Sequence, residues 1–72
     1  MRKEVPPGQR SNLSSVAQAL RILDELREHE PLGVSELAKR TGVAVSTAHR
    51  LLSTLVAADY ARQYSPGGKY FV

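Results

Sequence analysis

The sequence contains no cysteine, no long apolar run and no cluster of catalytic side chains. Without cysteine, disulfide bridges and thiolate metal sites are excluded. No apolar segment approaches the roughly 20 residues that a membrane-spanning helix needs, and residues 1–12 are too polar for a signal segment. The two histidines lie far apart, and no Ser/His/Asp, paired-carboxylate or phosphate-cradling glycine arrangement is present. These absences argue against an enzyme, a cofactor or a metal site, and they favour a cytoplasmic protein.

What is present is the composition of one small globular domain. Hydrophobic residues make up 42% and charged residues 24% of the chain, which is unlike a disordered protein. A chain of 72 residues buries only about 60% of the surface that it exposes when unfolded, so its margin of stability is expected to be thin.

The charges of the chain are unevenly distributed along it. The net charge is +3, with +2 on residues 1–13, −2 on residues 14–33 and +3 on residues 34–72. Affinity for DNA comes largely from the neutralisation of phosphates by basic side chains, so this asymmetry indicates a polyanion binder. Chance clustering of charge on a solvated surface is the alternative.

Residues 35–55 form the part of the chain around which the rest is organised. They contain two helical patterns separated by Gly42, which is free to take the positive φ that often follows a helix. Ser35 is the expected N-cap of the first helix, and Glu36 lies in the first turn, where it complements the helix dipole. Two short helices joined by such a turn are typical of a helix-turn-helix motif, here at about residues 34–55.

The second of these helices, expected at about residues 45–58, has two opposite faces. At about 100° per residue, polar residues fall on one side and apolar residues on the other. The two sets are Ser46, His49, Arg50 and Ser53, against Ala48, Leu51, Leu52 and Leu55. Ala44 at the cap position has no capping side chain, which leaves backbone amides for a phosphate or for water. A helix with these two faces can lie in a groove of DNA while it is anchored to a small core.

A longer helix is expected before this motif. Ser14 or Ser15 is the expected N-cap, and the helix is expected to end near His29 because Glu30 precedes a proline. The apolar stripe of this helix comprises Val16, Ala19, Leu20, Leu23 and Leu26, with Ile22 at its edge. Residues 1–12 show no periodicity and contain two prolines, so they are expected to form a flexible basic leader.

After Asp59 the apolar pattern changes to a period of about two. Residues 60–64 and 69–72 are expected to be strands, and Pro66-Gly67 between them suits the central positions of a type II turn. A hairpin placed after a helix-turn-helix motif is a wing, here at about residues 60–72. Arg62 and Lys69 are placed for phosphate or minor-groove contact, and a ribbon that only covers the core is the alternative. The predicted fold is mainly α with a small β-hairpin, a winged helix-turn-helix of three helices and a two-stranded wing.

Several segments together resemble the N-terminal winged helix-turn-helix domain of the IclR family of bacterial transcriptional regulators, over residues 13–72. The resemblance is carried by Ser15-Val16, Ala19-Leu20-Arg21-Ile22-Leu23, Leu32-Gly33-Val34-Ser35-Glu36-Leu37-Ala38, Thr41-Gly42-Val43 and Ser46-Thr47-Ala48-His49-Arg50-Leu51-Leu52. It implies a homodimer, or a tetramer of the full-length protein, that binds operator DNA. It also implies a small-molecule effector bound by a C-terminal domain that this chain does not include.

The chain departs from the family pattern at the base of the wing. Asp59 stands where the family usually has glycine, and Ala61 replaces the usual β-branched residue. The chain also stops at Tyr70-Phe71-Val72, where the family normally has Tyr-x-Leu-Gly before a linker helix.

The residues expected to contact DNA come from both helices of the motif and from the wing. They are Ala44, Val45, Ser46, Thr47, His49, Arg50, Ser53, Ser35, Lys39, Arg62 and Lys69. Arg50 is expected to bind guanine O6 and N7, although contact with phosphate alone is the alternative. The leading function is sequence-specific binding of double-stranded DNA in a bacterial transcriptional regulator, a repressor by the resemblance. The alternative is a winged-helix module that binds another protein.

Overall fold

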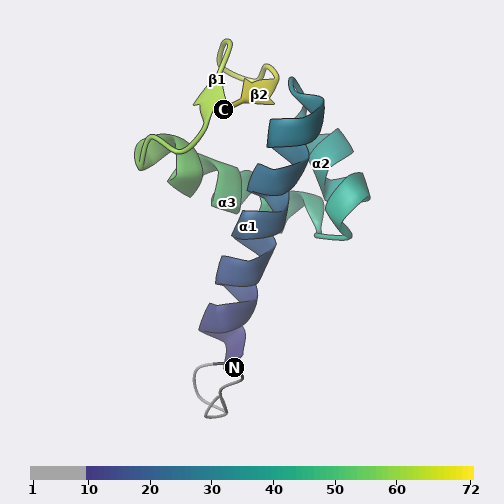
Figure 1. Ribbon diagram of the computed structural model, residues 1–72, viewed down its shortest axis with the longest axis vertical. Coiled ribbons are helices and arrows are strands. Elements are labelled where there is room, and N and C mark those ends of the chain that lie inside the picture. The colour runs from purple at the N-terminus through teal and green to yellow at the C-terminus, as the bar shows by residue number, and fades with distance from the viewer. Residues whose placement is uncertain (1–9) are drawn as a thin grey trace.

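The computed structural model describes residues 10–72, with side chains from residue 14 onward, and it contains three helices followed by a β-hairpin (Figure 1). The elements are α1 (Arg10–His29), α2 (Val34–Thr41), α3 (Val45–Ala57), β1 (Arg62–Gln63) and β2 (Tyr70–Phe71). The predicted winged helix-turn-helix fold is confirmed. Of the predicted leader, residues 1–12, the first nine residues lie outside the part of the chain that the structure describes.

Helix α1 begins earlier than predicted. It starts at Arg10, so Ser14 and Ser15 lie inside the helix and are not its N-cap, and residues 10–12 are helical. The last strong helix breakers in the sequence are Pro6, Pro7 and Gly8. Nothing between them and residue 14 prevents a helix, because serine and asparagine inside a helix cost only a few tenths of a kcal/mol relative to alanine, up to about 0.7.

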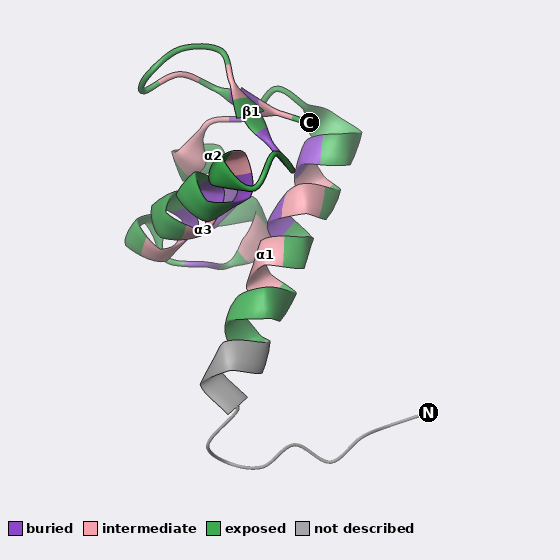
Figure 2. Cartoon of the chain, turned by 90° about the vertical axis from the view of Figure 1, so that its left-hand side faces the viewer, coloured by how far each residue is buried: buried purple, intermediate pink, exposed green. Residues whose placement is uncertain are grey.

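The buried face of α1 also differs from the predicted stripe. Ile22, expected at the edge, is fully buried together with Leu26, whereas Val16 and Leu20 are each 55% exposed. Helices α2 and α3 pack against the C-terminal half of α1, and the N-terminal half projects beyond the core (Figures 1 and 2). The apolar stripe of the sequence runs along the whole helix, but α1 has packing partners along only part of its length.

Helices α2 and α3 meet α1 in one small core, as their apolar patterns predicted. Apart from Ile22 and Leu26, its buried members are Leu32, Leu37, Ala38, Val43, Ala48, Leu52, Leu55, Ala61 and Tyr70. Gly42 takes a φ of 75°, and its amide donates to the carbonyl of Ala38 at 2.9 Å, which ends α2 as predicted. The turn that follows lets Val43 enter the core and sets α3 across α2.

The N-cap of α2 is Gly33 and not Ser35. The side chain of Glu36 reaches back and accepts a hydrogen bond from the Gly33 amide at 3.1 Å, and the Leu37 amide donates to the Gly33 carbonyl at 3.0 Å. Ser35 is therefore inside the first turn with its side chain exposed. Since Glu36 closes the helix start from the N3 position, a serine cap is not needed.

The wing is joined to the helices through a third piece of chain that the sequence pattern did not reveal. Strand β1 pairs with β2 antiparallel, with Arg62 opposite Phe71. On the other side of β2, the Leu32 amide donates to the Tyr70 carbonyl at 3.1 Å and the Tyr70 amide donates to the Leu32 carbonyl at 2.8 Å. These two bonds connect the wing to the link between α1 and α2.

The turn at the tip of the wing has the predicted type II form. Gly67 takes a φ of 77°, and the Gly68 amide donates to the Ser65 carbonyl at 2.8 Å. These are the glycine position and the hydrogen bond that define this turn.

Asp59 occupies the position that ends α3 in a left-handed conformation. Its φ of 69° is the one positive value among non-glycine residues of the described chain. The Asp59 amide donates to the Val56 carbonyl at 3.0 Å, and the Tyr60 amide donates to the Leu55 carbonyl at 2.8 Å. These two bonds are the Schellman pattern, in which the left-handed residue is usually glycine. Asp59 therefore adopts the left-handed backbone conformation that glycine usually supplies at this position, and it does so with a side chain attached.

We expect the substitution Asp59→Gly to stabilise the domain by about 0.5–1 kcal/mol. The left-handed conformation costs an ordinary L-residue roughly 1–2 kcal/mol, while the greater freedom of glycine in the unfolded chain returns part of this, about 0.5–1 kcal/mol. Thermal unfolding followed by circular dichroism should show a melting temperature raised by a few degrees. Asp59→Ala is the matched control, because it removes the same charge from the helix C-terminus but keeps the Cβ. Equal stability of the two variants would contradict the explanation.

Candidate nucleic-acid interface

The outer face of α3 carries the polar residues expected to read DNA. Ser46, His49, Arg50 and Ser53 are all exposed, and Thr47 is half-buried. On the opposite face Ala48 and Leu52 are fully buried and Leu55 is nearly so, while Leu51 is only half-buried. Within residues 14–72, no hydrogen bond or salt bridge involves the side chains on the outer face. Their donors are therefore available to a ligand.

The N-terminus of α3 lies next to this face. Ala44 is the N-cap, with an extended backbone at φ −61° and ψ 146°, and no side chain caps the helix. The first-turn amides thus keep the partial positive charge of the helix end. Ala44 and Val45 are both exposed beside those amides. The absence of a capping side chain, expected from the sequence, is confirmed.

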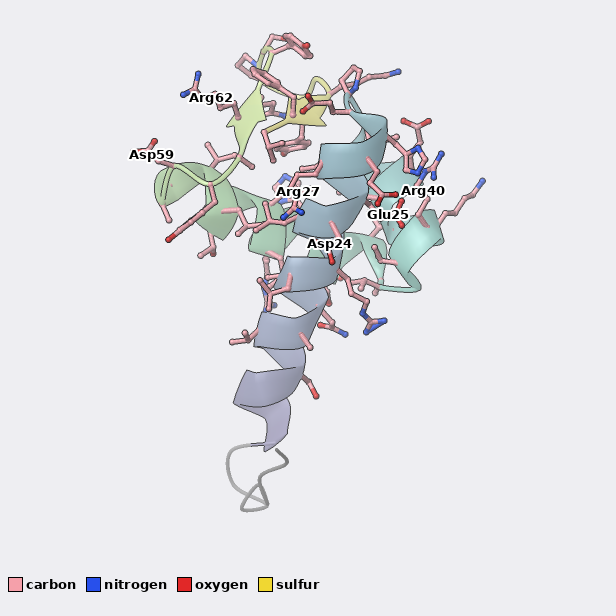
Figure 3. All side chains as sticks on the ribbon, in the orientation of Figure 1. Asp24, Glu25, Arg27, Arg40, Asp59 and Arg62 are labelled. Atoms are coloured by element: carbon pink, nitrogen blue, oxygen red, sulfur yellow. The ribbon has the colours of Figure 1, made fainter. Side chains whose placement is uncertain are left out.

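The two basic residues near the end of α2 have different surroundings. Lys39 is exposed, four residues along from the exposed Ser35 and so on the same side of the helix. The side chain of Arg40 instead reaches α1, where its Nη1 lies 3.4 Å from Oε1 of Glu25 (Figure 3). The sequence does not predict this ion pair, because Glu25 and Arg40 are brought together only by the packing of α2 on α1.

The outward side of the wing combines two cations with two aromatic rings. Arg62 lies opposite Phe71, and the Tyr64 amide donates to the Lys69 carbonyl at 3.0 Å, so Tyr64 lies opposite Lys69. The rings of Tyr64 and Phe71 stack across the hairpin with their centroids 4.4 Å apart. Sequence reasoning singled out Arg62 and Lys69 but not the rings. The alternation of residues along the two strands was the signal that could have found them.

The wing and the helix-turn-helix unit face the same side of the molecule. Figure 2 shows the tip of the hairpin and the α2–α3 unit together on the side away from α1. The exposed cations of these elements are Lys39, Arg40, Arg50, Arg62 and Lys69, of which Arg40 is paired with Glu25. The acidic side chains of α1 are partly paired with neighbouring bases, Asp24 with Arg27 at 3.8 Å and Glu25 with Arg40 (Figure 3). The structure thus places a basic, hydrogen-bonding side away from α1, which carries Asp24, Glu25 and Glu28.

An exposed helix face with free hydrogen-bond donors, flanked by a basic wing, defines the class of this domain as a DNA-binding winged helix-turn-helix. Residues 15–65 match the IclR helix-turn-helix domain. The chain belongs to the IclR helix-turn-helix family.

The similar proteins are transcriptional regulators. The chain is 34% identical over 62 residues to the HTH-type transcriptional regulator KdgR of Dickeya chrysanthemi, and equally to the regulator of that name from Escherichia coli (strain K12). The aligned stretch covers 86% of this chain but only 20% and 24% of the two regulators. The chain therefore spans less than a quarter of the length of these curated relatives. No solved structure matches it significantly.

The described part of the chain lacks two further features, a membrane-spanning helix and a cluster of metal-binding side chains. Residues 10–72 contain no helix long and apolar enough to cross a membrane. The same residues contain no group of three or more histidine, aspartate or glutamate side chains placed to hold a metal ion.

Proposed function

We propose that this domain binds double-stranded DNA in a sequence-specific manner, as the DNA-binding part of a bacterial transcriptional regulator that acts as a repressor. The observation that carries the proposal is the outer face of α3, whose donors have no partner in residues 14–72 while the opposite face is buried. Membership of the IclR helix-turn-helix family supports it, as do the regulator names of the similar proteins. Response to a small-molecule effector is assigned to a region outside this chain.

Within this proposal the contact residues divide into base readers and phosphate binders. Arg50 is exposed near the middle of α3 and is assigned to guanine O6 and N7, the commonest specific contact in the major groove. Beside Arg50, His49 and Ser46 donate hydrogen bonds to base acceptors or phosphates. Thr47 is half-buried and donates from the part of its side chain that remains exposed. Ala44 and Val45 contact thymine methyl groups. The remaining residues contact phosphate, namely Ser35, Lys39, Ser53, Arg62 and Lys69.

Selection of bound sequences from a random duplex pool is the direct test of this function. A specific reader enriches one sequence, and its affinity falls steeply with salt because bound phosphates release counterions. A palindromic sequence, with half-sites about 34 Å or a multiple of this apart, is expected from a two-fold symmetric dimer. If no duplex is bound even at low salt, the domain is instead a module for protein contact.

The homodimer is proposed to form through the part of α1 that projects beyond the core. Val16 and Leu20 are exposed there one helical turn apart, and half-buried Ala19 and Leu23 continue the apolar surface toward the core. A second copy of this chain is the proposed occupant, because two copies related by a two-fold axis place identical stripes against each other. The same symmetry presents two α3 helices to the two halves of a palindrome.

We expect Leu20→Glu to convert the dimer into a monomer while leaving the fold intact. A charge placed in the apolar contact of two helices is costly to bury, whereas in the monomer residue 20 is exposed. Analytical ultracentrifugation measures the change, and circular dichroism reports the fold. Arg21→Glu is the control, because it introduces the same charge at a neighbouring exposed position outside the stripe. An unchanged sedimentation coefficient for Leu20→Glu would exclude this interface.

A further inference from the structure

We infer that the outward side of the wing is a built phosphate-binding surface in which the hydroxyl of Tyr64 is the hydrogen-bond donor and Phe71 is the positioning residue. The surface consists of Arg62, Tyr64, Lys69 and Phe71. The inference rests on the proposed function, since it names how the same domain holds the DNA backbone beside α3. It adds two residues that neither the charge pattern nor the helix-turn-helix motif singles out.

The hairpin register places these four side chains on one side. Residues alternate between the two sides of a strand, so Arg62 and Tyr64 point the same way. Phe71 lies opposite Arg62, and Lys69 lies opposite Tyr64. The other side of the hairpin carries Ala61, Gln63 and Tyr70, of which Ala61 and Tyr70 are buried in the core. The four outward residues are therefore free of any packing role in the core.

The stack between Tyr64 and Phe71 fixes the direction of the phenol. The two rings are 4.4 Å apart with an interplanar angle of 26°, and they lie on the diagonal of the hairpin between the two cations. Tyr64 remains 65% exposed, and its hydroxyl makes no hydrogen bond within residues 14–72. Phenylalanine would give the same stack, so the stack alone does not account for a hydroxyl at this position.

The chemistry of the surface matches the sugar–phosphate backbone. Arg62 and Lys69 attract the negative charge, and tyrosine hydroxyls are among the neutral donors that contact phosphate oxygens and fix the register of a protein on a duplex. A neutral hydrogen-bond donor on the same side as two cations adds a preferred direction to the attraction of the charges for phosphate, which by itself has little. Because the tip of the wing lies on the same side as α2 and α3 (Figure 2), this backbone belongs to the duplex that α3 reads.

The test compares variants that remove the hydroxyl, the stack and a charge one at a time. The ligand is the duplex enriched from the random pool, and affinity is measured over a range of salt concentrations. We expect Tyr64→Phe to weaken binding by about 3- to 10-fold, the effect of one net hydrogen bond, with no change in melting temperature or in the slope of log affinity against log salt. Lys69→Gln weakens binding and lowers that slope by about 1, since it removes a phosphate-neutralising charge.

The role of Phe71 is tested by its dependence on the hydroxyl. Phe71→Leu keeps an apolar side chain but removes the stack. Because Phe71 acts only by positioning the hydroxyl, its loss of affinity should not exceed that of Tyr64→Phe. Combined with Tyr64→Phe, it should weaken binding no further, because residue 71 acts only through the hydroxyl. A purely structural role of Phe71 would instead give losses that multiply and would lower the melting temperature in parallel.

The outcomes separate this inference from the proposed function. If Tyr64→Phe binds with wild-type affinity while Arg50→Ala binds weakly, the assignment of the hydroxyl is wrong but the proposed function stands. A loss with Tyr64→Ala but not with Tyr64→Phe overturns it too, since the ring would then be the contact. If the wild-type chain binds no duplex at all, both proposals fail.

Discussion

Replacing Leu52 by alanine is expected to destabilise the domain by about 2–5 kcal/mol, and a loss at the upper end of this range would unfold much of it at room temperature. The side chain of Leu52 is fully buried near the middle of α3, a helix that packs against both α1 and α2. Its truncation removes apolar contacts and leaves a cavity, and such changes typically cost this much. The total stability of a small domain is only about 5–15 kcal/mol, and a chain of this size lies at the low end.

Denaturant or thermal unfolding measures the loss at Leu52. Leu20→Ala is the matched control, because it removes the same atoms from a side chain that is 55% exposed. Measured at a protein concentration at which the chain is monomeric, so that the proposed dimer contact of Leu20 is absent, this control should cost well under half as much. Equal losses at the two positions would show that the core is not centred where the structure places it.

Replacing Arg50 by alanine is expected to have the opposite profile, with an intact fold and weak binding. The guanidinium is exposed and has no partner within residues 14–72, so its removal leaves no buried group unsatisfied. Loss of a bidentate contact with guanine typically costs about 1–3 kcal/mol, or roughly 5- to 150-fold in affinity, and it relaxes the preference at that base pair. Binding to the selected duplex and to single-base variants of it measures both effects.

Arg27→Ala is the control for Arg50, because it also removes an exposed arginine but lies on α1, beside Asp24 (Figure 3). It should change affinity little. If Arg50→Ala lowered affinity for every duplex equally, and lowered the salt slope by about 1, Arg50 would be a phosphate contact. If it left affinity unchanged and lowered stability, the assignment of the two faces of α3 would be wrong.

The sequence by itself determined most of the helix-turn-helix unit. Residues at helical spacing define the two faces of α3, and Gly42 and the Pro66-Gly67 pair require backbone conformations that few other residues accept. These signals are local, since each depends on residues within a turn or two of chain. For the same reason the sequence predicts the order of the three helices and the wing, and this order carries the resemblance to the IclR family.

The tertiary structure alone decided which members of each pattern do the packing. Ile22 and not Val16 or Leu20 enters the core, because α2 and α3 cover only one half of α1. Leu32 becomes the partner of Tyr70, and Glu25 the partner of Arg40, across separations that no local period encodes. At the wing, alternation along the strands places Tyr64 and Phe71 on one side, but only the pairing of the two strands brings their rings into contact. Periodicity determines which face of a helix or strand a side chain occupies. Which residue it contacts depends on a second element, and only the tertiary structure places that element beside it.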